Sequence, residues 1–401
     1  MKTRTVQLGE VCEFIRGVTF PSGEGRPEHS GDTVACLTTS GVQQAVAWAS
    51  RRFIPRERIK NAKQVLQSGD ILISTANSKE LVGKSCIVGL PPFECTFGAF
   101  VTVARSTEEA DPRFLAFWMA SAHFQAWCYR MSSNTTNISN LRVSELEEMP
   151  LPLPSLPEQR RIAALLEQAD RLRRTRRYAL ELSDTFLPAA FLEMFGDPVR
   201  NPKGWPEAAL SELIRKHDKI NYGVVQPGVD LVEGVPIIRV ADLHDLPASR
   251  TGLKLIAAEI DERHAASRLV GDEVLIACVG SIGKVAKAEA NLRGCNIARA
   301  VARVPGDWDL VSRDFLVQYL ATARVHQYWT DETRTVSQPT LNILQIEETP
   351  VLLPPLPLQQ RFADLVRGHE RLRAAQRESL RQAEHLFQSL LHRAFAEGIE
   401  E

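Results

Sequence analysis

Residues 152–163 read PLPSLPEQRRIA, and residues 353–363, 200 positions further along the chain, read LPPLPLQQRFA. When residues 151–173 are aligned with residues 351–373 without a gap, 11 of the 23 positions are identical. Chance does not readily produce this register. The sequence therefore predicts a tandem repeat, with one copy of the segment in each half of the chain.

Each copy predicts the start of a long helix. Proline is favoured in the first turn of a helix and the residue before a proline avoids the α region, so Pro157 and Pro357 are natural helix starts after extended segments. Apolar residues then recur at steps of three, four or seven, which is typical of a coiled-coil seam. They are Ile162, Leu165, Ala169, Leu172, Ala179 and Phe186 in the first copy, and Phe362, Leu365, Leu372, Ala383, Leu386 and Leu390 in the second.

Both helices are expected to be unusually long. No glycine or proline interrupts residues 158–187 or residues 369–397. A helix of about 30 residues would be roughly 45 Å long, which is too long for an ordinary globular domain. Its apolar stripe needs a partner, and the other copy is the simplest one. Pro188 should kink or stop the first helix, whereas Gln388 at the corresponding position allows the second to run on to Phe395.

Composition sets the class of protein. A chain of 401 residues has room for two or three domains and a sizeable core. Hydrophobic content of 44% and charged content of 24% are typical of a globular protein. No apolar run is long enough to cross a membrane and the N-terminus lacks a secretory signal, so we expect a cytoplasmic protein. Seven cysteines without a Cys-x-x-Cys pair favour reduced thiols. Because the net charge is −1, nucleic-acid binding would require local basic patches.

The first 150 residues predict a mixed α/β domain. Gly69-Asp70 forms a turn that leads into a buried apolar run. We expect strands at 33–37, 64–74 and 97–103, and a helix at 113–129 in which aromatic residues pack into the core. The uncharged polar stretch 132–140 has two interpretations. It is either a solvated loop or a finger that hydrogen-bonds base edges or phosphates.

Residues 197–350 repeat this plan at lower similarity. Gly271-Asp272 corresponds to the first Gly-Asp turn, residues 315–329 to the aromatic helix, and residues 335–342 to the polar stretch. Two diverged globular units thus accompany two similar helices. We expect the domain division 1–152, 153–196, 197–353 and 354–401, in which the second and fourth segments are the helices.

The segment Gly83-Lys84-Ser85 invites a phosphate-loop interpretation, but the pattern requires a glycine where Ser78 stands. The corresponding segment 280–285 has Cys278 in that place and no hydroxyl after its lysine. A nucleotide site is therefore not predicted. The segment is either a glycine-permitted hairpin with an exposed lysine, or a loop that approaches DNA while Lys84 or Lys284 supplies charge.

The sequence shows no metal-ligand spacing, no nucleophile elbow and no dinucleotide fingerprint. We therefore expect no metal, no cofactor, and a binding or scaffolding role instead of catalysis. Arginine is concentrated in both helices. These arginines either form a solvated, salt-bridged helix face or contact DNA backbone or acidic partner surfaces. They are Arg160, Arg161, Arg171, Arg173, Arg174, Arg176 and Arg177, then Arg361, Arg367, Arg371, Arg373, Arg377 and Arg381.

At the repeated Pro-Leu-Pro-x-Leu-Pro-x-Gln segment, and at residues 191–205 after the first helix, the sequence resembles the specificity subunits of type I restriction-modification systems. The resemblance implies an α+β fold, a tandem repeat of two globular α/β target-recognition domains joined by two long antiparallel coiled-coil helices. Each domain would read one half of a bipartite sequence in double-stranded DNA, and the helices would act as a ruler.

The resemblance also implies partners. Two DNA adenine methyltransferase subunits would bind this chain, and restriction/translocase subunits would join them. S-adenosylmethionine and ATP would bind those partners and not this chain. Leu358 stands where the first copy has Glu158, so the two copies are not expected to make identical partner contacts. Half-sites about one DNA turn apart, roughly 34 Å, are commensurate with helices of roughly 45 Å.

Base reading is expected from polar loops, and affinity from basic residues on phosphates. The alternative function is a protein–protein scaffold with two peptide- or subunit-binding domains and no DNA, and a further alternative is a self-contained enzyme. The candidate DNA-binding residues are Thr75, Asn77, Ser78, Lys79, Lys84, Asn134, Thr135 and Asn137 in the first domain, and Arg239, Ser281, Lys284, Arg299, Gln338, Thr340 and Asn342 in the second.

Overall fold

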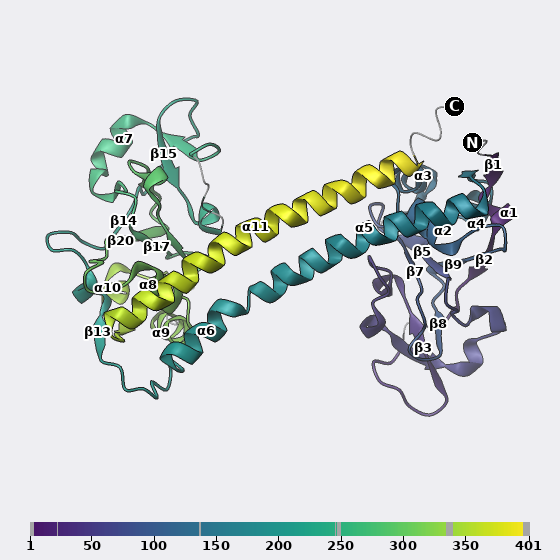
Figure 1. Cartoon of the computed structure of the whole chain (residues 1–401), viewed down its shortest axis with the longest axis horizontal. Helices are drawn as coiled ribbons and strands as arrows, with labels where there is room; N and C mark the ends of the chain where they lie inside the picture. Colours follow the sequence, from purple (N-terminus) through teal and green to yellow (C-terminus); the bar gives the residue numbers. More distant parts are fainter. Residues whose placement is uncertain are drawn as a thin grey trace. The chain divides into compact units, whose positions relative to one another are not determined.

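A computed structural model describes residues 4–21, 23–135, 138–244, 246, 250–333 and 340–395. The chain forms two compact units. Unit 1 comprises Met1–Tyr178 and Glu378–Glu401, and unit 2 comprises Ala179–Arg377. Both boundaries fall inside long helices, so each unit contains part of both helices as well as its own globular part (Figure 1).

Unit 1 is built on two sheets with buried central strands. The four-stranded sheet has the order β2-β9-β5-β7 and the three-stranded sheet the order β4-β3-β8. All four residues of β5 are buried, and the turn at Gly69, with φ of 93°, leads directly into it as expected. The strands are β2 Cys12–Arg16, β9 Val101–Ser106, β5 Ile71–Ser74, β7 Ser85–Ile87, β4 Arg52–Pro55, β3 Thr33–Leu37 and β8 Cys95–Phe97.

Two strand predictions in unit 1 were too long. Residues 64–70 are not a strand, because the polypeptide turns twice before β5 begins at Ile71. Residues 97–103 are divided between β8 and β9, and residues 98–100 lie between the two strands. The strands belong to different sheets, and the chain passes from one to the other by a turn at residues 99–100, in which Val101 N donates to the Gly98 carbonyl at 2.9 Å.

The predicted single helix at 113–129 is two helices, α2 Pro112–Met119 and α3 Ala122–Met131. Asp111 caps the first by accepting from the backbone N–H groups of Arg113 and Phe114. Ser121 caps the second by accepting from Phe124 N. A second cap within the aromatic run starts a new helix, because the capping side chain competes with continuation of the first.

Smaller elements complete unit 1. Strand β1 Arg4–Gln7 pairs antiparallel with β12 Pro150–Leu153, and helices α1 Leu8–Val11 and α4 Val143–Glu147 lie beside this pair in the chain. The polar stretch contains β-structure: β10 Ser133–Thr135 and β11 Ile138–Asn140 pair with each other, and β11 also pairs with β6 Ala76–Asn77. The solvated-loop interpretation of these residues is therefore wrong where they form strands.

Unit 2 has sheets in the orders β14-β20-β17-β18, β16-β15-β19 and β13-β21. Strand β17 is fully buried and follows the turn at Gly271, whose φ is 91°. The strands are β14 Asn221–Tyr222, β20 Val301–Val304, β17 Val274–Ala277, β18 Val285–Lys287, β16 Lys254–Ile256, β15 Val235–Ile238, β19 Asn296–Ile297, β13 Glu207–Ala209 and β21 Pro350–Leu352.

The aromatic helix predicted at 315–329 is likewise divided. Its parts are α8 Arg313–Leu320 and α9 Ala323–Thr333. Helix α7 Ala258–Arg263 and helix α10 Ile343–Glu347 are the other short helices described in unit 2. Trp329 on α9 is fully buried and donates from its indole N–H to Thr349 Oγ1 at 2.8 Å, which fixes α9 to the segment after α10.

The long helices begin where the prolines predict. Helix α5 is Leu156–Ser183 and helix α11 is Leu356–Phe395, so Pro157 and Pro357 each occupy the second helical position. The first helix stops before Pro188 and resumes as α6 Phe186–Phe195, whereas α11 is continuous. Pro188 has no N–H for the Asp184 carbonyl and its ring clashes with that oxygen, which explains the break. Both predictions for the helix ends are confirmed.

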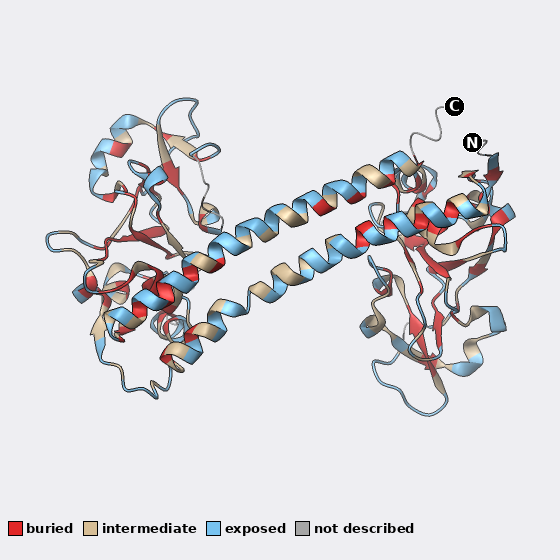
Figure 2. Cartoon of the chain, viewed as in Figure 1, coloured by how far each residue is buried: buried red, intermediate tan, exposed pale blue. Residues whose placement is uncertain are grey.

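The ends of the long helices are buried in the unit cores (Figure 2). In unit 1, Phe395 of α11 packs on Phe114 with ring centroids 5.4 Å apart. In unit 2, Phe191 of α6 packs on Phe315 at 5.8 Å and on Phe362 of α11 at 5.5 Å. Aromatic contacts of this kind bury large apolar areas, so each unit is completed by a helix segment from the other half of the sequence.

The two long helices also contact each other within each unit. In unit 1, the guanidinium of Arg173 lies 3.9 Å from the centroid of the Phe387 ring, and Arg177 forms an ion pair with Glu384 at 2.7 Å. In unit 2, His369 Nε2 lies 2.8 Å from Ser183 Oγ and 2.9 Å from the Ser183 carbonyl oxygen. Ser183 is the last residue of α5, so the His369 imidazole contacts a carbonyl group at the end of that helix.

Candidate nucleic-acid interface

Two polar segments of unit 1, more than fifty residues apart in sequence, meet in one small sheet. Strand β11 pairs with β6 so that Ser139 lies opposite Asn77 and Asn140 opposite Ala76. Leu141 N donates to the Thr75 carbonyl oxygen at 2.8 Å and extends the connection. Strand pairing thus joins the segment 75–79 to the strands 133–135 and 138–140, and we call these segments together the unit 1 reading loops, as candidates for contact with DNA.

The side chains of the first segment have different environments. Thr75 is 6% exposed and its hydroxyl lies 3.1 Å from that of Thr102, so it holds the segment in place. Asn77 is half-buried; its amide donates to Ser74 Oγ at 3.0 Å and its oxygen accepts from Ser78 N at 2.9 Å. Lys79 lies 4.5 Å from the centroid of the Tyr129 ring. Asn77, Ser78 and Lys79 are each partly exposed and keep polar atoms toward solvent.

A turn at residues 79–83 follows this segment and leads to Lys84. Gly83 has φ of 83°, and a Cβ there would lie 2.5 Å from Cys128 Cβ on α3, so only glycine fits. Ser74 N donates to the Lys84 carbonyl and Gly83 N to the Ser74 carbonyl, both at 2.8 Å. The turn joins β5 to β7, which confirms the hairpin geometry. The Lys84 ammonium donates to Gln43 Oε1.

Sequence analysis missed Phe100, which lies beside the reading loops. Its carbonyl oxygen accepts from Thr75 N at 3.0 Å and Ala76 N at 3.3 Å, while its side chain is 60% exposed. The prediction of one strand over residues 97–103 placed Phe100 inside a strand, although residues 98–100 lie between β8 and β9. Gly98, a residue that often marks a bend in a strand, was the available signal.

Unit 2 joins its corresponding segments in the same way. Val279 and Thr340 form an antiparallel bridge, and Leu341 N donates to the Cys278 carbonyl at 2.9 Å. Tyr222 donates its hydroxyl to the Leu341 carbonyl. Burial, together with nearby Cys278, raises the pKa of Tyr222 to about 12 against the opposing effect of Arg299, so this hydroxyl keeps its proton.

The candidate residues of unit 2 lie around this junction. Ser281 is exposed and Lys284 half-buried in the turn between β17 and β18. Arg299 is exposed, and Cys278 N donates to the next residue's carbonyl at 2.8 Å. Arg239 is exposed and pairs with Asp242 at 3.1 Å. Asn342 caps α10 by accepting from Gln345 N at 3.0 Å, so its oxygen is already engaged.

Several candidates remain undescribed in part or in full. The backbone of Asn134 and Thr135 forms part of β10, but their side chains are outside the described residues. Asn137 and Gln338 lie outside the described residues altogether. Thr340 is exposed and takes part in the bridge to Val279.

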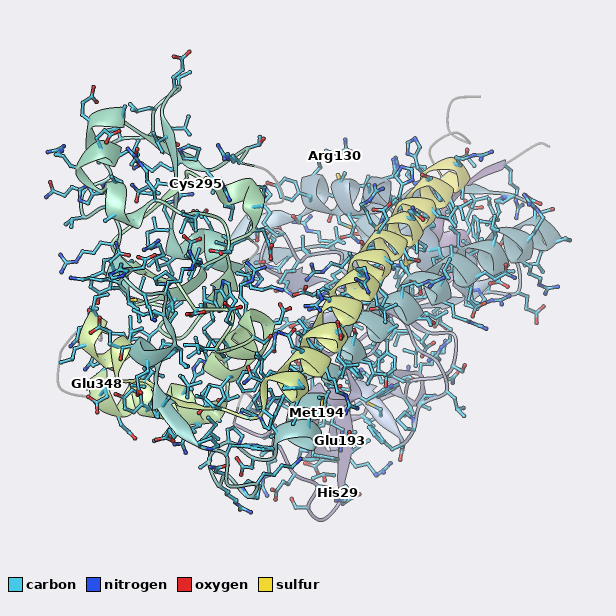
Figure 3. All side chains as sticks on the ribbon, turned by 60° about the vertical axis from the view of Figure 1, so that its left-hand side comes forward. His29, Arg130, Glu193, Met194, Cys295 and Glu348 are labelled. Carbon is cyan, nitrogen blue, oxygen red and sulfur yellow. The ribbon has the colours of Figure 1, made fainter. Side chains whose placement is uncertain are left out.

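The thiols are poorly suited to covalent chemistry or metal binding. All seven cysteines are free and buried, including Cys295, which lies directly before β19 and is labelled in Figure 3. Burial raises the pKa of Cys12, Cys128 and Cys278 to about 12 in each case, so the nucleophilic thiolate is scarce at neutral pH. Over the described ranges, no three His, Cys, Asp or Glu side chains are grouped to hold a metal ion.

Comparisons with known proteins show what the chain is similar to. A model of the type I restriction modification DNA specificity domain matches residues 2–182. This region contains the unit 1 reading loops and the start of α5. This part of the chain is thus similar to a type I restriction modification DNA specificity domain.

Individual relatives extend the similarity beyond that region. The chain is 26% identical to the type I restriction enzyme StySPI specificity subunit of Salmonella potsdam, over 98% of this chain and 88% of that protein. It is 28% identical to the EcoBI specificity subunit of Escherichia coli, over 66% of this chain and 62% of that protein. The chain thus spans less than two thirds of the EcoBI subunit. The chain is thus similar to type I restriction enzyme specificity subunits over most of its length.

Solved structures share the fold. The S subunit of a type I restriction-modification system from M. genitalium is 15% identical with a TM-score of 0.60, and the alignment covers 98% of this chain and 96% of that one. A chain from a study of complex assembly and conformational transition of the type I R-M system is 23% identical with a TM-score of 0.57, over 98% and 99% of the two chains. Among the helices that the structure describes, none is long and apolar enough to span a membrane.

Proposed function

We propose that this chain is the DNA sequence-recognition subunit of a type I restriction-modification complex, and that each unit reads one half of a bipartite target. The observation that carries the proposal is the junction of polar segments in each unit. Residues 75–77 meet 139–141 in unit 1, and residues 278–279 meet 340–341 in unit 2. Hydroxyl, amide and lysine side chains on such loops can donate to and accept from base edges and phosphates.

The proposal includes a tandem repeat with target-recognition domains at 1–152 and 197–353. The sheet orders support it: the strands equivalent to β2-β9-β5-β7 form β14-β20-β17-β18, and a parallel pair joins β3 to β8 and β15 to β19. The helices at 153–196 and 354–401 would form an antiparallel coiled coil that sets the half-site spacing. Within unit 1, Arg173 contacts Phe387 and Arg177, one turn further along α5, contacts Glu384, three residues earlier in α11, which is the order that an antiparallel pair requires.

The chain would act without catalysing the reaction itself. In this proposal, two adenine methyltransferase subunits dock on the helices and supply methyl transfer, and restriction/translocase subunits supply ATP-driven steps. The proposal rests on the similarity to type I specificity subunits and on the duplicated helices, which offer two related docking surfaces. The residues predicted for DNA contact then divide by role: Thr75 and Asn342 hold the loops, whereas Asn77, Ser78, Lys79, Lys84, Ser281, Lys284 and Arg299 present polar atoms to DNA.

The test begins with the host's methylated sites. Methylome sequencing of cells that carry the system should return a split adenine-methylated target, and the purified chain with its methyltransferase partner should bind that duplex in a gel-shift assay. A duplex with either half-site scrambled should bind much more weakly. If the complex assembles and binds neither duplex, the chain is a scaffold; methyl transfer by the purified chain alone would show an enzyme.

A further inference from the structure

Unit 1 contains a cavity of about 540 Å³ beside the reading loops, partly open to solvent. Three parts of unit 1 form its walls. The globular part contributes Gln43, Lys84 and residues of α2, the helix α5 contributes a run of charged side chains, and the C-terminal part of α11 contributes Phe387 and Gln388. The proposed function gives this cavity no role.

The charge of the walls favours an anion. Five cationic side chains line the cavity against two carboxylates, Glu167 and Asp170. Arg173 and Arg174 share the single carboxylate of Asp170, with N–O distances of 2.6 Å each. Asp170 therefore cannot neutralise both guanidinium groups, and positive charge remains at the wall. The five cations are Lys84, Arg113, Arg171, Arg173 and Arg174.

Arg171 is the least compensated of these cations. It is exposed, lines the cavity, and has no ion-pair partner among the described residues. Lys84 is likewise bonded to the neutral amide of Gln43 and not to a carboxylate. Gln44 and Gln388 add amide groups to the wall. Guanidinium, ammonium and amide donors together suit phosphate oxygens.

One residue of the cavity wall, Lys84, is tied by its backbone to the start of the reading loops. Lys84 is held to Ser74 by a backbone hydrogen bond of 2.8 Å, and Ser74 directly precedes the segment 75–79. Every base pair of a duplex is flanked by phosphates, so a duplex read by these loops carries its backbone past the base of the loop.

We propose that this cavity receives the sugar–phosphate backbone of the DNA that the unit 1 loops read, with Arg171, Arg174 and Lys84 as the phosphate contacts. The inference rests on the proposed function and deepens it, because it adds a helix-borne, sequence-independent contact to the base-reading loops. Phosphate contacts fix the register of a protein on the duplex and supply most of the salt-dependent affinity.

Unit 2 does not reproduce this charge pattern. Ala374 stands on α11 where α5 has Arg174, and Asp314 stands on α8 where α2 has Arg113. Lys287 of β18 is held by Asp314 at 2.7 Å and by Glu370 at 2.9 Å. The phosphate contact is therefore specific to unit 1. Arg371, which is 200 positions after Arg171, provides a matched position without the proposed contact.

The test compares single arginine-to-alanine variants in the complex with the methyltransferase subunit. Arg171→Ala should weaken binding of the target duplex roughly fivefold at about 0.1 M salt and lower the slope of log affinity against log salt by about 1. The same factor should apply to a duplex of scrambled sequence, because phosphates carry no base identity. Arg176→Ala on the same helix and Arg371→Ala on α11, both exposed and without an ion pair among the described residues, should change neither quantity.

Three results would overturn the inference. Equal losses for Arg171→Ala and Arg176→Ala would indicate a diffuse electrostatic effect. A loss confined to the target sequence would indicate base reading. A loss of methyltransferase assembly with unchanged DNA affinity in the complex that remains would make the cavity a partner site. If the wild-type complex binds no DNA, the proposed function fails as a whole, which separates that failure from failure of the cavity assignment.

Discussion

At the scale of single residues, a buried glutamine connects each long helix to its globular part. Gln159 is 1% exposed; its Oε1 accepts from Asp111 N at 2.9 Å and its Nε2 donates to the Pro154 carbonyl at 2.9 Å. Gln359 repeats both contacts with Ser312 N at 2.9 Å and the Pro354 carbonyl at 2.8 Å. The glutamine thus links the start of the long helix, the proline segment before it and the cap of the aromatic helix.

Gln159→Ala should lower the free energy of unfolding by about 1–3 kcal/mol, because it leaves the buried N–H of Asp111 unpaired, while the Pro154 carbonyl is only partly buried. Urea unfolding followed by circular dichroism measures this change. Gln168→Ala, at an exposed glutamine of the same helix, should change it by less than about 0.5 kcal/mol. Equal effects at the two positions would show that the buried hydrogen bonds of Gln159 do not stabilise the fold.

These residues also show what the sequence could predict. Gln159 belongs to the repeated motif that indicated the long helices, yet its hydrogen bonds run to residues nearly fifty positions earlier and follow only from tertiary packing. The polar segments 75–79 and 132–140 were both selected from composition. Their junction was not, because strand pairing between distant segments has no local signal. Thr75 was predicted as a DNA contact for its hydroxyl. The side chain is buried, and its hydroxyl lies against that of Thr102.

At the scale of elements, local signals predicted helix ends well and helix continuity poorly. Pro157, Pro357 and Pro188 act through their own backbone, so their effects are independent of the fold. The aromatic runs instead contained capping residues such as Ser121, whose choice between cap and helix interior depends on the surrounding packing. Both aromatic helices were therefore predicted as single helices and both are divided.

The contact between the aromatic helix and the long helix has opposite polarity in the two units. Arg113 on α2 pairs with Glu167 on α5 at 3.4 Å, whereas Asp314 on α8 pairs with Arg367 on α11 at 3.0 Å. Exchange of the long helices between units would place Arg113 near an arginine and Asp314 near a glutamate. Like charges at these positions disfavour that exchange.

Double-mutant cycles should find unequal coupling in the two units. The Arg113 and Glu167 side chains are 42% and 48% exposed, so their coupling should be about 0.2–1 kcal/mol. Lys287 and Asp314 are 16% and 10% exposed and 2.7 Å apart, so their coupling should reach about 1.5–3 kcal/mol. Alanine substitutions, singly and together, with urea unfolding at neutral pH, measure both. Equal coupling energies would show that burial does not strengthen the second pair.

At the scale of the whole molecule, the proposed function makes the helices a ruler, and a ruler can be lengthened. The unit boundaries lie between Tyr178 and Ala179 in α5 and between Arg377 and Glu378 in α11. The helix–helix contacts of unit 1, such as Arg177 with Glu384, and those of unit 2, such as Ser183 with His369, lie on their own sides of these boundaries. An insertion at both boundaries therefore leaves every contact of each unit intact.

Insertion of seven helix-forming residues at both boundaries should lengthen the methylated target's spacer by about three base pairs. Seven residues add roughly 10.5 Å at 1.5 Å per residue, and each base pair rises about 3.4 Å. Seven residues also restore the same helix face in a coiled coil, so the seam is preserved. Methylome sequencing of cells carrying the variant reads the spacer directly, while both half-site sequences should stay unchanged. The same insertion in α5 alone leaves the helices unequal in length and should abolish methylation. An unchanged spacer in the double insertion would mean that something other than the helices sets the distance between the half-sites.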